Sequence, residues 1–158
     1  MDMFDRTARY WLVVASREHV GRAVAGGFVQ ACRGKLRPLE RMRAGDGVVC
    51  YSPRERMDRV SPRVQSFVAL GRLVDDRSYP FAMPDGRVPH RRDVAWRAVR
   101  PVALADLAPS LHRATQPGWP MMLRRGHLEL DAHDFLLIAD AMLIAVEERL
   151  DARQHPRA

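Results

Sequence analysis

The chain has 158 residues, 47% of them hydrophobic and 28% charged, and its formal net charge is +7. These proportions are typical of a globular protein and exclude an intrinsically disordered chain. A chain of this length most simply forms one domain over residues 1–158, which buries roughly 70% of its unfolded surface. The positive charge favours an anionic partner such as nucleic acid.

The cysteines and the apolar stretches indicate the cellular compartment of the protein. Cys32 and Cys50 form neither a C-x-x-C pair nor a disulfide framework, which favours the reducing cytoplasm. The N-terminal stretch carries acidic residues and lacks the long apolar core of a signal peptide. The longest apolar stretch, Phe135–Val146, is interrupted by Asp140 and is too short to span a bilayer. We therefore expect a cytoplasmic protein without membrane contact.

In chain order, the first predicted element is a strand over residues 10–15 (YWLVVA), apolar on both faces and therefore central in a sheet. Ser16 is a typical N-cap for a short helix, whose apolar stripe ends at Gly26–Gly27. An extended run over residues 28–32 follows. Lys35, the only lysine of the chain, lies just beyond this run.

The rest of the chain alternates short strands with loops, because turn-forming glycines, prolines and aspartates separate the apolar runs. We expect strands at residues 48–52, 65–74, 79–81, 91–97, 99–104 and 123–130, a short helix at 104–112, and a final helix capped by Asp131 that ends near residue 150. Short strands, few helices and long loops predict an α+β fold with one mixed sheet curled towards a barrel. They argue against a doubly wound parallel sheet.

The standard catalytic signatures are missing from this sequence. It contains no G-x-S-x-G, no P-loop, no G-x-G-x-x-G and no H-E-x-x-H. His127 and His133 lie close in sequence but on different predicted elements, so they make a weak zinc pair. Ser16 and His19 are neighbours on a helical turn, which helix capping explains without nucleophilic catalysis. We expect no catalytic residue, no metal and no cofactor.

Residues suited to ligand binding occur near the ends of the predicted strands. Ser16 and Arg17 end the first strand, and Tyr51–Arg54 ends the third. Between them, Phe28 and Gln30 point to the same side of an extended run, because side chains alternate along a strand. An aromatic ring beside a primary amide can stack on a planar base and hydrogen-bond its edge. Simple core packing is the alternative for both Phe28 and Tyr51.

Four stretches of the sequence together resemble the EVE domain, a PUA-like domain related to YTH and ASCH domains. In order, they read YWLVVASREHVGRAVAGGFVQACRGK, LRPLERMRAGDGVVCYSPRE, RRDVAW and LRRGHLELDAHDFLLIADAM. The resemblance covers about residues 10–142. It implies a PUA-like mixed β pseudo-barrel with short flanking helices and a C-terminal helix. It also implies a cleft for a single nucleobase, often modified, that is flipped out of DNA or RNA, and it implies no established catalytic activity.

The resemblance assigns roles to particular positions of this sequence. It implies a base-binding pocket formed by Ser16, Phe28, Gln30, Lys35, Tyr51, Ser52 and Pro53. We expect phosphate contacts from Arg17, Arg54, Arg91 and Arg92. The base would stack on Phe28 or Tyr51, and Gln30 and Ser16 would contact its edge. The expected partner is DNA or RNA that carries a modified base.

The chain departs from the family pattern in three places. Relatives often have CHGK where this chain has Cys32–Lys35 (CRGK), which alters the charge beside the cleft. They often have an aromatic residue at the position of His90, which weakens the case for a full aromatic cage. The final helix also continues beyond Met142, so residues 143–158 form a helical extension and tail. This helix is apolar nearly all round, so it must be buried on more than one side. We therefore predict that its Leu143–Leu150 part contacts a second copy of the chain in a homodimer.

Two other functions compete with a non-catalytic reader of modified bases. The first is an enzyme that acts on a nucleotide or modified base and uses Ser16, His19 or Lys35. The second is a protein–protein adaptor whose basic surface is incidental. Turnover would identify the enzyme, and binding that ignores salt would identify the adaptor.

Overall fold

The computed structural model describes residues 7–154, and the side chains of residues 7–143. Within this range the strands are β1 (Tyr10–Val14), β2 (Phe28–Val29), β3 (Gly47–Arg54), β4 (Arg63–Pro80), β5 (His90–Trp96), β6 (Val102–Ala103) and β7 (His127–Leu130). The α-helices are α1 (Arg17–Gly26), α2 (Leu36–Glu40), α3 (Leu104–Leu107), α4 (Trp119–Met122) and α5 (Ala132–Gln154). Short 3-10 turns lie at Cys32–Gly34, Ala108–Ser110, Arg113–Thr115 and Leu123–Arg125.

The strands form one mixed sheet in the order β2-β5-β4-β3-β1-β7, and β6 pairs with β4 beside this path. The β1–β3 pair is parallel, with Tyr10 opposite Gly47 and Val14 opposite Tyr51. The other strand pairs among the described residues are antiparallel. The predicted α+β fold with one mixed sheet is confirmed. Across residues 7–154, β2 and β7 remain the two ends of the order, so the sheet is not a closed barrel.

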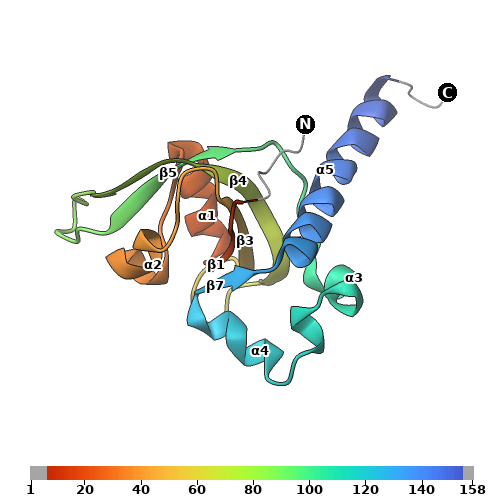
Figure 1. Cartoon of the computed structure of the whole chain (residues 1–158), viewed down its shortest axis with the longest axis horizontal. Helices are drawn as coiled ribbons and strands as arrows, with labels where there is room; N and C mark the ends of the chain where they lie inside the picture. The colour runs from red at the N-terminus through yellow and green to blue at the C-terminus, as the bar shows by residue number, and fades with distance from the viewer. Residues whose placement is uncertain (1–6, 155–158) are drawn as a thin grey trace.

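Alternation along β1 divides the core between the two faces of the sheet. Tyr10 and Leu12 belong to a cluster that also contains Phe135 and Met142 of α5. The intervening Trp11 belongs to a second cluster, which contains residues of α1 and α2. Figure 1 shows α5 on one side of the sheet and α1 and α2 on the other. Strand β1 is therefore buried on both faces, as its continuous apolar run predicts.

Local capping signals set the ends of α1. The Ser16 hydroxyl accepts a hydrogen bond from the His19 backbone N–H at 3.2 Å. At the other end, Gly27 adopts a left-handed φ of 74°, which glycine reaches without steric cost. This helix therefore lies where the sequence predicts it.

Four predicted strands have different bounds in the structure. The expected run over 28–32 ends at Val29, because Cys32, Arg33 and Gly34 adopt positive φ angles of 49°, 63° and 85°. The strand expected at 123–130 begins only at His127, after a 3-10 turn and Gly126 at φ 77°. The strands expected at 65–74 and 79–81 form one long β4, whose pairing with β5 shifts register between Leu73 and Ser78.

Helix α5 begins beside Asp131, whose Oδ1 accepts a hydrogen bond from the Asp134 N–H at 2.8 Å. Leu143 is partly buried against the core cluster of α5 and the sheet. The predicted homodimer contact through Leu143–Leu150 involves side chains that, beyond Leu143, lie outside those the structure describes. Of the helices in the described part of the chain, none has the length and apolar character needed to cross a bilayer.

Candidate functional site

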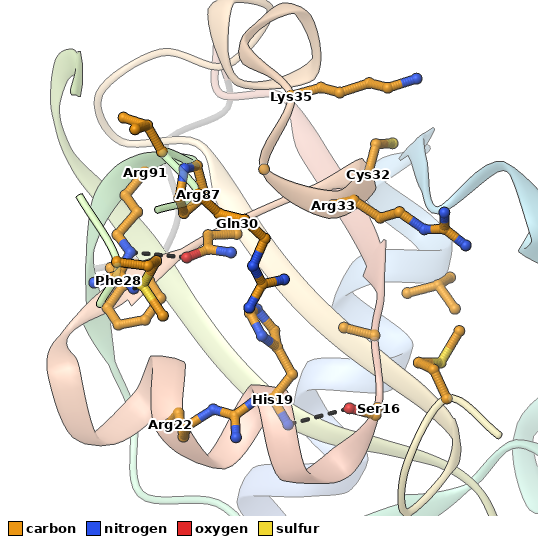
Figure 2. Close-up of a pocket in the computed structure, with 17 residues that line it drawn as sticks. Ser16, His19, Arg22, Phe28, Gln30, Cys32, Arg33, Lys35, Arg87 and Arg91 are labelled. Atoms are coloured by element: carbon orange, nitrogen blue, oxygen red, sulfur yellow. Dashed lines mark hydrogen bonds between the residues drawn. The ribbon is translucent and has the colours of Figure 1, made fainter. Parts of the chain in front are cut away.

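A cavity of about 980 Å³ lies where the end of β1, helix α1 and strand β2 meet the 32–35 turn and two loops. One loop contributes Met57, and the other contributes the segment from Met83 to Pro89. Figure 2 shows polar side chains from these elements around a shared space. Its described lining consists of Val14, Ala15, Ser16, His19, Arg22, Phe28, Gln30, Cys32, Arg33, Gly34, Lys35, Met57, Met83, Arg87, Val88, Pro89 and Arg91.

The Arg91 guanidinium lies between two aromatic rings at one wall of this cavity. Its Cζ is 3.7 Å from the centroid of the Phe28 ring and 3.8 Å from that of Phe81. Its Nη2 also donates to Met83 Sδ at 3.5 Å. Burial lowers the pKa of the Arg91 guanidinium, and the group stays protonated because arginine cannot be deprotonated in proteins. The cation thus covers one face of each ring.

The same arginine fixes the orientation of the Gln30 amide. Arg91 Nε donates a hydrogen bond of 2.8 Å to Gln30 Oε1. A guanidinium has donors only, so the amide oxygen must face Arg91 and the amide nitrogen must face away from it. Figure 2 shows this nitrogen turned towards the side of the space that His19 and Arg87 occupy. Gln30 therefore offers two N–H donors to the cavity.

Ser16 and His19 lie at the floor of the cavity, but they do not form a nucleophile and a base. The Ser16 hydroxyl accepts from the backbone N–H of His19, which is a capping interaction. Burial, followed by the nearby charges of Arg22 and Arg91, lowers the pKa of the His19 imidazole below 6.5. The imidazole is therefore neutral at pH 7 and offers the cavity one lone pair or one N–H.

The charge around the cavity has one sign. Besides Arg91, the cationic lining residues are Arg22, Arg33, Lys35 and Arg87, and among the described lining residues none is Asp or Glu. Glu18 binds Arg22 at 2.9 Å, and Asp85 binds Arg87 at 2.7 Å, both from outside the lining. In Figure 2, Lys35 and Arg33 extend outward from their turn. The cavity thus attracts anions.

The 32–34 turn holds the rim in an uncommon backbone conformation. Cys32 and Arg33 have φ angles of 49° and 63°, although side chains other than glycine rarely adopt left-handed angles. A Cβ at Gly34, where φ is 85°, would lie 2.4 Å from the Cβ of Pro89. The Cys32 thiol donates to the Arg125 carbonyl at 3.4 Å. Contacts from two distant segments thus keep this turn in place.

The structure brings some of the predicted site residues together and separates others. Ser16, Phe28, Gln30, Lys35 and Arg91 line the cavity, whereas Tyr51, Ser52, Pro53, Arg17, Arg54 and Arg92 do not. The ring of Tyr51 is buried in the core, 5.5 Å from that of Phe67. The neighbouring Ser52 is fully buried. The expectation that Tyr51 and Ser52 contact a base is therefore corrected by their burial inside the sheet.

The predicted phosphate contact at Arg92 is also corrected. This side chain is only 1% exposed, and its Nη1 donates to the carbonyls of Leu39 and Met42 at 2.8 and 2.7 Å. Its Nη2 donates to the carbonyl of Asp75. Successive residues of a strand face opposite sides, so Arg91 borders the cavity while Arg92 binds backbone carbonyls inside the protein.

Two other predicted phosphate contacts, Arg17 and Arg54, lie outside the cavity and bind residues of the β3–β4 loop. Arg17 binds the carboxylate of Glu55 at 2.5 Å. Arg54 donates to the Ser61 carbonyl at 2.7 Å. Sequence reasoning missed Arg22 and Arg87 as cavity cations, and it noted the charge of Arg33 beside the cleft without assigning the residue a contact. Arg33 lies two residues before the predicted Lys35, but only the long-range fold brings Arg87 to this site.

A separate cluster contains His112, Asp131, His133 and Asp134, whose potential ligand atoms lie within 4.8 Å of one another. The two imidazole rings stack at 3.7 Å. Asp134 already accepts hydrogen bonds from the backbone N–H groups of His112 and Arg113, which anchors the 113–115 turn to α5. The weak pair of His127 and His133 does not come together, because the buried His127 stacks on Trp11 at 4.8 Å.

Comparison with known proteins gives a consistent family match. A sequence model of the EVE domain matches residues 9–141. A UPF0310 protein of Streptococcus sanguinis is 37% identical over 134 residues, which make up 85% of this chain and 93% of that protein. The UPF0310 protein YdcG of Bacillus subtilis is 35% identical over 134 residues, covering 84% of this chain and 91% of that protein. All the lining residues of the cavity fall inside the matched region.

Solved structures with similar folds include complexes with nucleic acids. The YTH domain-containing protein mmi1, solved with RNA, has a TM-score of 0.59 at 8% identity and covers 94% of this chain and 92% of its own. The YTH domain of Zygosaccharomyces rouxii MRB1, solved with N6-methyladenosine RNA, gives 0.55 at 16% identity, covering 89% and 88%. Human THYN1, solved with 5-methylcytosine-containing DNA, gives 0.51 at 15% identity, covering 85% and 97%. At these identities the similarity shows the fold alone.

Proposed function

The chain belongs to the EVE domain family, and we propose that it binds nucleic acid by holding one flipped, modified base in the cavity beside Gln30. The observation that carries this proposal is the composition of the cavity. Fixed amide donors lie inside it, while cations and no described carboxylate surround it. A volume of about 980 Å³ is at the upper end for small-molecule sites and leaves room for a base with its sugar and phosphate.

The fold neighbours support this choice of ligand. Two of them were solved with polymers that carry a methylated base, N6-methyladenosine RNA in one case and 5-methylcytosine DNA in the other. A base must leave its stack before a closed pocket can surround it, which costs a few kcal/mol. Base extrusion is therefore part of the proposal.

Phosphate binding is assigned to the rim and base recognition to the interior. Arg33 and Lys35 reach outward, where the backbone of an extruded nucleotide would pass. Gln30 then contacts the edge of the base. Stacking on the face of Phe28 that Arg91 covers at 3.7 Å would require Arg91 to move away from the ring. The apolar side chains of Met57, Met83 and Val88 provide an alternative surface for the base to pack against.

We propose a binding module without catalysis. The candidate nucleophile Ser16 is engaged in capping α1, and the neutral His19 contacts it through the backbone only. Nucleophilic catalysis needs a hydrogen bond between the nucleophile and the side chain of a base. The arrangement of these two residues supports binding over turnover.

The test is a binding panel of matched DNA and RNA oligonucleotides, each with one modified base, measured by fluorescence anisotropy at fixed salt. We expect at least one modified base to bind more tightly than its unmodified counterpart. Gln30→Ala should narrow this ratio, because lost edge hydrogen bonds remove discrimination. The control Arg77→Ala changes an exposed arginine outside the cavity and should leave the ratio unchanged. Absence of binding by every oligonucleotide, or an unaltered ratio in a folded Gln30→Ala protein, would refute the proposal.

A further inference from the structure

We infer that the base held in this cavity presents a hydrogen-bond-accepting edge, made of carbonyl oxygens or a carboxylate substituent, and is not selected for a methyl group alone. This inference rests on the proposed function and names the class of base. It follows from three features of the wall: the direction of the Gln30 amide, the imbalance between donors and acceptors, and the lack of an aromatic cage in the described lining.

The direction of the Gln30 amide is set by a contact with no alternative. Arg91 Nε donates to Gln30 Oε1 at 2.8 Å, and an amide turned the other way would place two donors against each other. The amide oxygen is thereby used by the protein. The two N–H groups of Nε2 have no hydrogen-bond partner within residues 7–143 and face the cavity. A ligand edge that meets Gln30 must supply acceptors.

Most of the remaining polar side chains of the lining are donors, and the neutral imidazole of His19, which has one acceptor nitrogen beside its N–H, is the exception. Arg22, Arg87 and Arg91 carry donors only. Ser16 uses its oxygen to accept the His19 N–H, so its own hydroxyl hydrogen is available for donation. Carboxylates, the strongest acceptors among side chains, are absent from the described lining. An exocyclic amino group in this space would find few side-chain acceptors, whereas a carbonyl or carboxylate would find several donors.

The described lining of the cavity holds the ring of only one Phe, Tyr or Trp residue, that of Phe28, which is too few for an aromatic cage around a methyl group. Arg91 covers one face of Phe28 at 3.7 Å and one face of Phe81 at 3.8 Å. The Cδ1–Cε1 edge of the Phe28 ring is close to α1, because a Cβ at Gly26 would lie 2.6 Å from Phe28 Cε1. Trp11, Trp96 and Trp119 do not line the cavity.

Magnitudes also favour recognition through acceptors. Burying one methyl group increases affinity only about fourfold. A hydrogen bond to a charged group increases it about tenfold or more. A wall built of cations and fixed amide donors therefore discriminates most strongly through the acceptors of the base. Candidates include O4 of uracil and thymine, O6 and N7 of guanine, and the carboxylate of a 5-carboxycytosine.

Two matched pairs of oligonucleotides test this inference. Thymine and 5-methylcytosine carry the same methyl group but differ in having a carbonyl or an amino group at C4. 5-Carboxycytosine and 5-methylcytosine share the amino group but differ in the substituent at C5. We expect wild-type protein to bind thymine several-fold more tightly than 5-methylcytosine, and 5-carboxycytosine about tenfold more tightly. The first pair is neutral, so it separates acceptor recognition from attraction by the overall charge.

The variant Gln30→Glu provides the reciprocal test with the volume of the side chain preserved. One carboxylate oxygen can still accept from Arg91, while the other replaces the amide nitrogen as an acceptor in the cavity. We expect the preference between thymine and 5-methylcytosine to reverse or to disappear. Circular dichroism and a melting curve establish whether the variant is folded. If the variant does not fold, the affinity ratios of the wild-type protein for the two oligonucleotide pairs still decide the inference.

The outcomes separate the inference from the proposed function. If wild-type protein binds 5-methylcytosine as tightly as or more tightly than both partners, and Gln30→Ala still changes base preference, the cavity binds a base but the acceptor assignment is wrong. If no oligonucleotide binds, or if no Gln30 variant affects any ratio, the proposed function fails and the inference fails with it.

Discussion

The guanidinium carbon of Arg91 lies 3.7 Å from the centroid of the Phe28 ring, so the protein itself covers an aromatic face that a ligand would otherwise contact. The same guanidinium orients Gln30 through a hydrogen bond of 2.8 Å. Phe28 thus acts on the cavity through Arg91, and its replacement should affect the direction of the amide as well as the packing of the core.

Phe28→Leu keeps much of the side-chain volume but removes the ring beneath Arg91. We expect the free energy of unfolding to fall by about 1–3 kcal/mol, from lost packing and the lost cation–π contact. Base preference should narrow because Arg91 no longer fixes Gln30. The matched control Phe81→Leu removes the outer ring, which is 43% exposed, and should cost about 0.5–1 kcal/mol. Urea unfolding and anisotropy measure both quantities, and full base preference in Phe28→Leu would contradict this account.

Arg33→Ala combined with Lys35→Ala should weaken the salt dependence of binding to single-stranded nucleic acid. Each phosphate contact contributes about 0.7 to the slope of log affinity against log salt concentration. The double variant should therefore lower the slope by about 1.4 if both cations contact phosphate. Arg77→Ala, an exposed arginine outside the cavity, is the control. An unchanged slope in the double variant would mean that phosphates bind elsewhere.

Arg92→Met should destabilise the protein without altering this salt slope. The substitution removes the donor to the carbonyls of Leu39, Met42 and Asp75. The Leu39 carbonyl keeps the backbone N–H groups of Arg41 and Met42 as donors, whereas the carbonyls of Met42 and Asp75 lose Arg92. Buried acceptors left without a donor cost about 1–3 kcal/mol each, so we expect a loss of about 2–6 kcal/mol in urea unfolding. Arg92→Lys retains the charge but reaches fewer carbonyls, and should lose a smaller amount. A stable Arg92→Met protein with a flattened salt slope would restore Arg92 as a phosphate contact.

Gly34→Ala tests the contact between the rim turn and the β4–β5 loop. Its φ is 85°, and the added Cβ would lie 2.4 Å from the Cβ of Pro89. Gly45→Ala is a close control, since its φ is 86° but its added Cβ would meet no atom within 4 Å. The control should cost about 1–2 kcal/mol from left-handed strain alone, and Gly34→Ala should cost clearly more. Equal losses in urea unfolding would show that Pro89 moves aside freely.

The buried His127 predicts a pH dependence of stability. Burial, followed by the charge of Arg41, lowers the pKa of His127 to about 4 in the folded protein. The unfolded chain, with a histidine pKa near 6.5, binds this proton at a higher pH than the folded protein does. Stability is therefore lost as the pH falls from about 6.5 to about 4, by roughly 3 kcal/mol in total.

The variant His127→Phe isolates this contribution. Phenylalanine can keep the stack on Trp11, which lies 4.8 Å from the His127 ring, but it cannot be protonated. Urea midpoints at pH 7, 5.5 and 4.5 should therefore decline less steeply in the variant than in the wild type. Parallel declines would assign the acid sensitivity to other groups.

Local signals predicted the elements that position the floor of the cavity. Ser16 and Gly27 define helix α1 through capping chemistry that is readable from neighbouring residues. Alternation predicted that Phe28 and Gln30 share a side, and both line the cavity. Each of these predictions concerns residues that lie close together in sequence.

Non-local contacts explain what the sequence could not predict. The orientation of Gln30 depends on Arg91, which is 61 residues away along the chain. Tyr51 lies within β3, but which face of the strand it occupies depends on the pairing with β1 and β4. For the same reason, the neighbouring side chains of Arg91 and Arg92 point to opposite faces of β5. A pattern of period two gives the alternation of faces without saying which face the ligand site occupies.

The hydrogen bonds that join the cavity wall to the segment before β7 carry a consequence for the order of folding. Val14 donates its backbone N–H to the Gly126 carbonyl at 2.9 Å, and the Cys32 thiol donates to Arg125. Every lining residue in the described part of the chain precedes residue 92, yet these contacts need a segment more than 30 residues further on. During synthesis, these lining residues would leave the ribosome before the 125–126 segment that Val14 and Cys32 contact. The site is therefore a late product of folding, and contacts of such long sequence separation slow its formation.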